Sequence, residues 1–198
     1  MKRIVVATKN EKKKKELKKL VSGVGAKVIC LTDLKMHLPR VIEDGKTFRQ
    51  NAIKKALTFS RYVEGIILAD DSGLMVEALD GKPGVRSARF AHTKATDMEN
   101  NAKLLRLMKD IPTRKRQATF VCSVAVAESG NLVGTCEASC RGSIGFRSKG
   151  NNGFGYDPLF TPQGFAKTFA QLSQSSKNRI SHRAKALKKA KEIILKYL

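Results

Sequence analysis

Gly65–Leu74 reads G-I-I-L-A-D-D-S-G-L. The apolar run Ile66–Leu68 has the length of a buried strand, and Asp70, Asp71 and Ser72 follow it closely. A strand that ends here places two carboxylates at the carboxyl edge of a sheet, where open α/β folds bind their ligands. This pattern favours a site for a metal or a proton. The alternative is an Asp-Ser-Gly turn whose side chains only satisfy backbone groups.

An anion-binding turn is predicted near the N-terminus. Lys2–Ala7 reads as the first strand, and a helix is expected from the following turn to about Ser22. Thr8 or Asn10 can cap this helix, whose free N–H groups and dipole favour an anion where Thr8, Asn10 and Lys13 project. The alternative is a plain helix cap followed by a solvated lysine face.

A second strand and a second helix precede the acidic strand. We expect the strand at Lys27–Leu31 and the helix from Thr47 to about Tyr62. Glu43 lies in the loop between them and reads, by itself, as a solvated acid. Lys55 lies on the helix that leads into the acidic strand, so we predict that it points at the same edge of the sheet.

The second half of the chain predicts a strand, a helix and then a hairpin. The expected strand is Leu74–Leu79, the helix is Asp97–Met108, and the hairpin pairs Gln117–Ala127 with Leu132–Arg141. The fold class is therefore α/β, with a mixed sheet that is parallel early and antiparallel late. No internal repeat or linker separates independent domains, so we expect a single domain over residues 1–198.

A glycine-rich loop at residues 150–158 reads G-N-N-G-F-G-Y-D-P. Glycines around Phe154 and Tyr156, Gly155 among them, let a flat ring approach the backbone and stack, and Asp157 can accept hydrogen bonds from ring N–H groups. The loop is predicted to bind a base. The alternative is a hairpin whose two aromatic rings lie in the core.

Three cationic or ionisable side chains gather around the start of the last helix. Lys177 precedes it, and His182 and Arg183 stand in its first turn after Ser181. Cations at a helix N-terminus oppose the helix dipole. Their placement therefore favours a ligand there.

The charge of the chain is strongly positive. Lys plus Arg number 39 against 17 Asp plus Glu, a net charge of +22, which concentrates anions at the surface. Trp is absent, Tyr numbers three, and no nucleic-acid-binding signature occurs. The charge therefore indicates binding to phosphate, and specific nucleic-acid binding is not expected.

Cysteine spacing and hydropathy argue against a zinc- or disulfide-stabilised protein and against a membrane protein. The four cysteines show no C-x-x-C spacing, so we read them as reduced core residues rather than a zinc or disulfide framework. No apolar run approaches the roughly 20 residues needed to span a bilayer. We expect a cytoplasmic protein with no membrane association.

The ordered motifs resemble the inosine triphosphate pyrophosphatase family, also called the Ham1 family, over essentially the whole chain. The matching segments are A-T-K-N-E-K-K at Ala7–Lys13, E-D-G-K-T-F at Glu43–Phe48, A-D-D-S-G-L at Ala69–Leu74, P-G-V-R-S-A-R-F at Pro83–Phe90, G-F-G-Y-D-P at Gly153–Pro158 and S-H-R at Ser181–Arg183. The resemblance implies a long twisted central sheet flanked by helices, in two lobes with the active-site cleft between them. It also implies Mg²⁺-dependent hydrolysis of ITP, dITP and XTP to monophosphate and pyrophosphate by a homodimer.

The same resemblance implies a role for each matching residue. Asp71 activates the attacking water, and Glu43 and Asp70 position Mg²⁺ together with it. The triphosphate is held by Thr8, Asn10, Lys13, Lys55 and Ser72. The base is stacked and read by Phe154, Gly155, Tyr156, Asp157, Lys177, His182 and Arg183. The chain departs from the family pattern at Lys9, Gln50 and Gln171, which affects the surroundings of the metal site and its charge balance.

Base polarity gives a preference for oxo-purines. Hypoxanthine and xanthine carry a 6-oxo acceptor, which His182 and Arg183 can satisfy as donors, whereas adenine presents a 6-amino donor. ITP and XTP are therefore expected to react far faster than ATP. Two other readings stay open: a non-enzymatic nucleic-acid-binding protein, and a Maf-type pyrophosphatase acting on modified pyrimidine nucleotides.

Overall fold

The computed structural model describes residues 3–8, 10–11, 13–14, 16–17, 25–34 and 36–198. The predicted end of the first helix near Ser22 and the departure at Lys9 lie outside the described residues. Helical backbone is present at Glu11, Lys13 and Leu17, as the sequence predicts for that helix.

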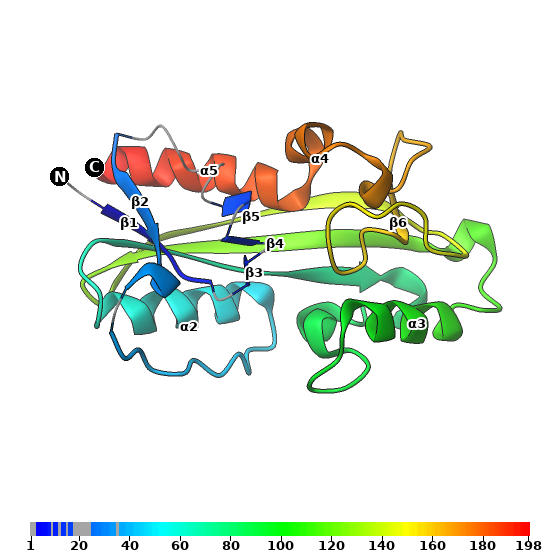
Figure 1. The fold of residues 1–198 in the computed structure, drawn as a ribbon, viewed down its shortest axis with the longest axis horizontal. Helices are drawn as coiled ribbons and strands as arrows, with labels where there is room; N and C mark the ends of the chain where they lie inside the picture. The colour runs from blue at the N-terminus through cyan, green and yellow to red at the C-terminus, as the bar shows by residue number, and fades with distance from the viewer. Residues whose placement is uncertain (1–2, 9, 12, 15, 18–24, 35) are drawn as a thin grey trace. The chain divides into compact units, whose positions relative to one another are not determined.

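The strands described form one mixed sheet with the order β2-β1-β3-β4-β5-β6 (Figure 1). Their bounds are β1 Arg3–Val6, β2 Lys27–Cys30, β3 Ile66–Val76, β4 Gln117–Glu128, β5 Asn131–Ile144 and β6 Phe160–Pro162. β1 is parallel to both β2 and β3, whereas β5 and β6 are antiparallel. The mixed α/β fold with helices flanking the sheet is therefore confirmed.

The helices α2, α3 and α5 begin where the sequence predicts, whereas α4 was not predicted. Their bounds are α2 Phe48–Ser60, α3 Asp97–Leu107, α4 Gln174–Ile180 and α5 His182–Tyr197, with short 3₁₀ turns η1 Leu31–Asp33, η2 Glu77–Leu79, η3 Gly84–Arg89, η4 Thr113–Lys115 and η5 Phe169–Gln171. Thr47 caps α2 by accepting from the backbone N–H of Gln50, and Thr96 caps α3 in the same way. On α3 Leu104 is buried, whereas Leu107 is exposed.

The prediction that a strand ends at Asp70–Gly73 and a second one begins at Leu74 is wrong. β3 runs without a break from Ile66 to Val76. It is paired on both sides at first, with β1 and β4 as neighbours in the sheet, and β4 continues long after β1 has ended. A neighbour on one edge is enough to keep the acidic segment extended.

The chain divides into two compact units. Unit 1 comprises residues 1–71, 122–138 and 184–198, and unit 2 comprises residues 72–121 and 139–183. Each unit has its own apolar core, and the single domain over residues 1–198 stays a prediction.

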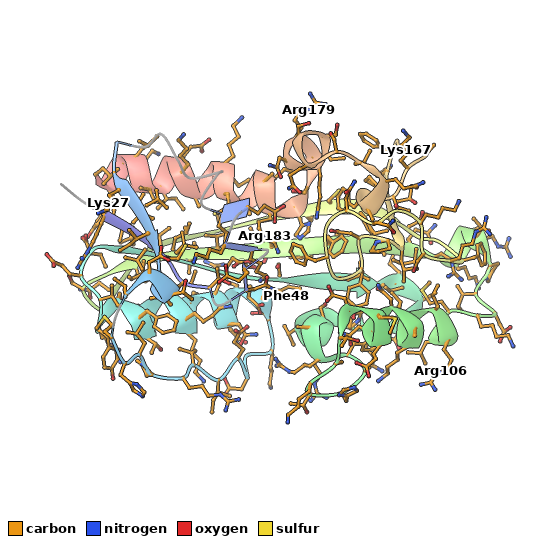
Figure 2. All side chains as sticks on the ribbon, viewed as in Figure 1. Lys27, Phe48, Arg106, Lys167, Arg179 and Arg183 are labelled. Atoms are coloured by element: carbon orange, nitrogen blue, oxygen red, sulfur yellow. The ribbon has the colours of Figure 1, made fainter. Side chains whose placement is uncertain are left out.

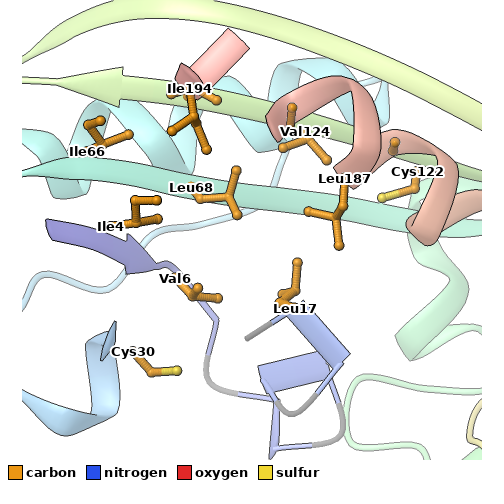
Figure 3. Close-up of a cluster of buried hydrophobic side chains, with 13 residues drawn as sticks. Ile4, Val6, Leu17, Cys30, Ile66, Leu68, Cys122, Val124, Leu187 and Ile194 are labelled. Carbon is orange, nitrogen blue, oxygen red and sulfur yellow. The ribbon is translucent and has the colours of Figure 1, made fainter. Parts of the chain in front are cut away.

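Unit 1 buries both faces of its strands. Ile4, Val6, Ile66 and Leu68 belong to one cluster, which α5 covers through residues such as Leu187 (Figures 1 and 3). The residues between them belong to a second cluster on the opposite face, which α2 covers (Figure 1). They are Val5, Ala7, Ile67 and Ala69. This period-two alternation is what a strand buried on both sides requires.

Unit 2 is built around a cluster of aromatic and aliphatic side chains. The Phe120 ring lies 4.7 Å from that of Phe160 and 5.9 Å from that of Phe169, centroid to centroid. Leu104 and Met108 of α3 belong to the same cluster. These contacts anchor α3 and the segment after β6 within the unit.

The cysteines lie in or beside the apolar clusters of the two units. All four cysteines are free thiols, three of them buried and Cys136 half-buried. Throughout the described part of the chain, no helix is long and apolar enough to cross a membrane.

Candidate active site

The paired aspartates lie in β3 just past the end of β1. The parallel register runs from Ile4 opposite Ile66 to Val6 opposite Leu68, and the next residue of the chain, Ala7, still donates its N–H to the Leu68 carbonyl at 2.8 Å. Asp70 and Asp71 therefore extend beyond the carboxyl end of β1, as predicted, although their own strand continues. Successive side chains of a strand face opposite sides, so the two carboxylates have different surroundings.

Asp70 faces the predicted anion-binding turn at Thr8, Asn10 and Lys13. Lys13 forms an ion pair with it, with 3.0 Å between Nζ and Oδ2, and the Asp70 side chain is 1% exposed. Asn10 accepts the backbone N–H of Lys13 at 3.1 Å, and Thr8 Oγ1 accepts the N–H of Asn10 at 3.2 Å. The structure thus brings Thr8, Asn10 and Lys13 together at the start of the first helix.

Lys55 of α2 connects Glu43 to the acidic strand. Its ammonium donates to the Asp70 backbone carbonyl at 2.5 Å and lies 3.2 Å from Glu43 Oε2. Glu43, which the sequence indicates as a solvated acid, is therefore held by an ion pair, and its side chain is about one-third exposed. Helix spacing alone did not identify this contact, because it depends on the path of the loop before α2.

Asp71 is buried on the α2 side of the strand. The Asn51 side chain donates from Nδ2 to Asp71 Oδ2 at 2.9 Å, and its Oδ1 accepts the backbone N–H of Gly45 at 2.8 Å. Burial raises the pKa of the Asp71 carboxyl above its ordinary value of 3.8, while the charges of Lys55 and Lys13 and the Asn51 hydrogen bond oppose this rise. A buried acid with a raised pKa beside lysines is a candidate proton acceptor.

Asn51 is a site residue that the sequence analysis did not identify. It is fully buried near the start of α2, although an amide on an inner helix face costs free energy unless both its ends are bonded. A buried Asn among the apolar positions of a predicted helix is the signal that points to it.

The glycine-rich loop of unit 2 is closed by Asp157. Its Oδ2 accepts the backbone N–H of Phe154 at 2.8 Å and the ammonium of Lys177 at 2.5 Å. Gly153 has a positive φ of 79°, and a Cβ there would clash with Asp157 Oδ2. The predicted Asp157 is thus brought into the loop, with one of its oxygens fixing the loop backbone.

Cations flank the Phe154 ring. The Lys177 ammonium lies 5.1 Å and the Arg183 guanidinium carbon 5.3 Å from the ring centroid. Arg183 also donates to Ser72 Oγ at 2.8 Å. Lys177, Arg183 and Phe154 therefore come together, and Ser72, which is predicted to assist the triphosphate, is bonded to Arg183.

Tyr156 and His182 are packed as core residues. The Tyr156 hydroxyl donates to the Ser87 carbonyl at 2.8 Å, and burial raises the pKa of its phenol. The His182 ring stacks on Phe120, with 4.7 Å between centroids and 7° between planes. For Tyr156 the core alternative considered for the loop describes its packing, whereas Phe154 is only half-buried.

The first turn of α3 holds both backbone groups of Gly155. Its N–H donates to Asp97 Oδ2 at 2.8 Å, and its carbonyl accepts the side-chain N–H of Asn101 at 3.0 Å. Asp97 and Asn101 are one helical turn apart, so they reach the same loop peptide. The sequence analysis missed this pair, because nothing in the loop sequence indicates which helix it meets.

Two departures from the family pattern are helix-capping residues. The side chain of Gln50 accepts the N–H groups of Lys46 and Thr47 at the start of α2. Gln171 Oε1 accepts the Thr168 N–H at 3.0 Å in η5. A capping box takes Glu or Gln at this position, so Gln preserves the local structure and removes only the negative charge.

The carboxylates suit a hard cation that shares its ligands with a substrate. In the parts of the chain that the structure describes, no three or more His, Cys, Asp or Glu side chains form a metal cage. Mg²⁺ usually takes one or two protein carboxylates and completes its shell with waters and phosphate oxygens. Asp70 and Asp71, with Glu43 linked to them through Lys55, fit that mode of binding.

Fold and site together define a class: a mixed α/β protein with a buried acid among lysines in one unit and a cation-flanked aromatic loop in the other. The sequence profile of the Ham1 family matches residues 4–193. The chain belongs to the Ham1 family.

Named relatives are similar over almost their whole length. The dITP/XTP pyrophosphatase of Desulforamulus reducens is 48% identical over 97% of this chain and 95% of that protein. The dITP/XTP pyrophosphatase of Oceanobacillus iheyensis is 43% identical over 94% of this chain and 95% of its own. The solved structure of a Ham1 protein from Coxiella burnetii matches with a TM-score of 0.89 and 36% identity, covering 99% of this chain and 100% of that one.

Proposed function

We propose that this chain is a nucleoside triphosphate pyrophosphatase that hydrolyses ITP, dITP and XTP to the monophosphate and pyrophosphate. The observation that carries the proposal is Asp71, a buried carboxylate with a raised pKa among lysines, in a chain closely similar to dITP/XTP pyrophosphatases. Such an activity removes deaminated purine nucleotides before they enter DNA or RNA.

The lysines of unit 1 neutralise the triphosphate. A triphosphate carries about four negative charges, and attack on it requires cations where charge develops. Lys13 and Lys55 already contact carboxylates or carbonyls and can exchange these for phosphate oxygens. Asn10 and the first helical N–H groups add donors at the same place.

Asp71 acts as the general base. It takes the proton of a water that attacks the α-phosphorus, the bond from that phosphorus to the bridging oxygen breaks, and pyrophosphate leaves. Asn51 holds the carboxylate in place by donating to its Oδ2 atom. The lysines keep Asp71 ionised against the effect of burial.

Mg²⁺ belongs to the same proposal, with Glu43, Asp70 and Asp71 as its carboxylate positions. When bound, Mg²⁺ would neutralise phosphate charge and orient the reacting phosphate. Lys13 forms an ion pair with Asp70, and Lys55 forms one with Glu43. We infer that these ion pairs keep the carboxylates in place until metal and nucleotide arrive together.

The loop of unit 2 binds the base. Phe154 offers a ring for stacking, and Arg183 is the donor for a 6-oxo group. Adenine would place an amino donor against this donor, and a buried unmatched donor costs about 1–3 kcal/mol. Tyr156 and His182 act by packing the loop and the start of α5.

The assembly and location in this proposal are a homodimer and the cytoplasm, where nucleoside triphosphates are present. Analytical ultracentrifugation of the purified chain tests the dimer. A sedimentation coefficient that matches a single chain at micromolar concentration would remove that part of the proposal.

A panel of nucleotides tests the activity. The chain is incubated with Mg²⁺ and ITP, dITP, XTP, GTP, ATP or a modified pyrimidine triphosphate, and products are identified by phosphorus NMR. We expect monophosphate and pyrophosphate from the deaminated purines. Preference for the pyrimidine nucleotide would favour a Maf-type enzyme, and the absence of any pyrophosphate would favour a binding protein.

A further inference from the structure

One part of the surface is basic without acidic partners. Between Glu137 and Glu192 the sequence holds a single acid, Asp157, and this side chain is buried against Lys177. The exposed cations of this segment in unit 2 are Arg141, Arg147, Lys149, Lys167 and Arg179. Figure 2 shows Lys167 and Arg179 pointing away from the ribbon.

Four of these cations surround the β5–β6 pairing. Gln163 donates its N–H to the Arg141 carbonyl at 2.9 Å, directly after the antiparallel register of β5 with β6. Thr168 donates its hydroxyl to the Lys149 carbonyl at 2.7 Å, which joins the segment before the glycine-rich loop to the segment that holds Lys167. We call Arg141, Phe146, Arg147, Lys149, Phe165 and Lys167 the β5–β6 surface.

None of its four cations forms an ion pair with an acidic residue that the structure describes. Exposed lysines and arginines elsewhere in the chain do so, as Lys54 does with Asp44. Unneutralised cations in one region attract a polyanion rather than a second copy of the same basic chain. This argues against self-association through the β5–β6 surface.

Two phenylalanines are exposed within this basic surface. Phe146 is 61% and Phe165 43% exposed; Arg147 directly follows Phe146, and Lys167 lies two residues after Phe165. The chain as a whole carries no nucleic-acid-binding signature and no Trp. Here the two kinds of residue occur together and both reach solvent.

Phe146 is also held rigidly from below. The guanidinium carbon of Arg116 lies 4.2 Å from the ring centroid. Arg116 is itself fully buried and fixed by bonds to the carbonyls of Met108, Ile111, Ile144 and Gly145. One ring face therefore rests on a fixed cation while the other is available for stacking, at a low cost in conformational entropy.

We propose that the β5–β6 surface binds single-stranded nucleic acid without sequence specificity. Arg141, Arg147, Lys149 and Lys167 contact phosphates, and bases stack on Phe146 and Phe165. Grooves that combine cations with exposed aromatic rings bind single strands in this way, because every base has a stacking face. None of these six residues is among those that we assign to nucleotide hydrolysis.

The salt dependence of binding follows from the four cations. Each phosphate contact to a single strand contributes about −0.7 to the slope of log affinity against log salt, so four give about −2.8. Raising the salt from about 50 to about 200 mM should then weaken binding about 50-fold. A variant with a single remaining contact should weaken only about three-fold over the same range.

Fluorescence anisotropy with a 5′-fluorescein-labelled single-stranded DNA of about 20 nucleotides tests the proposal. The charge variant is Arg147→Gln, Lys149→Gln and Lys167→Gln together. The matched control removes the same charge from another part of unit 2, at Lys94, Arg106 and Lys109, which are also exposed. We expect the charge variant to lose most affinity and its salt dependence, and the control to retain both.

The stacking rings are tested separately. Phe146→Ala and Phe165→Ala should each weaken single-stranded binding by about five-fold or more and leave double-stranded binding unchanged. Lys13→Ala should bind the oligonucleotide as the unaltered chain does, which excludes capture by the triphosphate site. Pyrophosphate release should be unchanged in the charge variant, so failure of this proposal is distinguishable from failure of the enzymatic one.

Three results would overturn the proposal. The first is equal loss of affinity in the control variant, which would indicate only the overall charge. The second is binding of inorganic polyphosphate as tight as that of the oligonucleotide, because stacking would then contribute nothing. The third is binding to phosphatidylserine vesicles with no binding to the oligonucleotide, which would make the surface a membrane site.

Discussion

Asp71→Asn separates the chemistry of this site from its stability. The substitution keeps the size and shape of the side chain, and the new amide oxygen can still accept the Asn51 hydrogen bond. The fold and nucleotide binding should therefore persist. Removal of a general base lowers the rate by about 10²–10⁴, which raises the barrier by about 2.7–5.4 kcal/mol.

The same substitution should stabilise the metal-free protein at neutral pH. Burial raises the pKa of Asp71, so the folded state binds its proton more tightly than the unfolded state does. The stability linked to that proton is fully present below the unfolded pKa of about 3.8 and is lost as the pH rises through the raised folded value. Asparagine, which does not ionise, should therefore unfold at a higher temperature than aspartate at pH 7, with the difference closing below about pH 4.

Two assays read the two effects. Steady-state pyrophosphate release gives kcat and KM, and thermal unfolding in EDTA gives the melting temperature across pH. Asp110→Asn, an exposed acid on the chain, is the control and should change neither. An Asp71→Asn enzyme with undiminished kcat would refute the general-base role, and a lower melting temperature at pH 7 would show that the carboxylate is stabilising rather than strained.

Four further substitutions test the metal, the base and the loop. Glu43→Ala should raise the Mg²⁺ concentration needed for half-maximal turnover, measured by metal titration; an unchanged requirement would remove Glu43 as a ligand. Arg183→Ala should lower kcat/KM for ITP and narrow its margin over ATP by about 5- to 150-fold in parallel assays, whereas a margin as wide as before would place base reading elsewhere. Asp97→Ala and Asn101→Ala each remove a hydrogen bond to Gly155 and should raise KM for ITP more than they lower kcat. Met98→Ala, at an exposed position on the same helix, is the control and should change neither constant. A loss of kcat with KM unchanged would argue against a positioning role for Asp97 and Asn101.

Local patterns predicted much of the fold. β1 and the first half of β3 are apolar runs buried on both faces, so their composition is decided by the core alone. The start of α2 follows from Thr47 with a partner three residues later, a cap whose geometry is local. Sequence could not show that β3 continues past Gly73, because β4 provides the pairing from a distance in the chain.

In the candidate site too, local contacts could be predicted from the sequence and contacts between distant segments could not. Thr8, Asn10 and Lys13 lie within one helical start, where spacing alone determines their proximity. The link from Glu43 to Lys55 and the hold of Asp97 on Gly155 depend on tertiary contacts, for which the sequence has no periodic signal. Family resemblance supplied Glu43, whereas nothing pointed to Asp97.

A competition between dITP and dATP tests the central claim most directly. Both nucleotides at equal concentration are placed in one tube with the purified chain and Mg²⁺, and their monophosphates are followed by chromatography. We expect dIMP and pyrophosphate to form first, because kcat/KM for dITP should exceed that for dATP by about 10²-fold or more. Equal consumption of the two nucleotides, or release of dIDP and inorganic phosphate in place of dIMP and pyrophosphate, would contradict it.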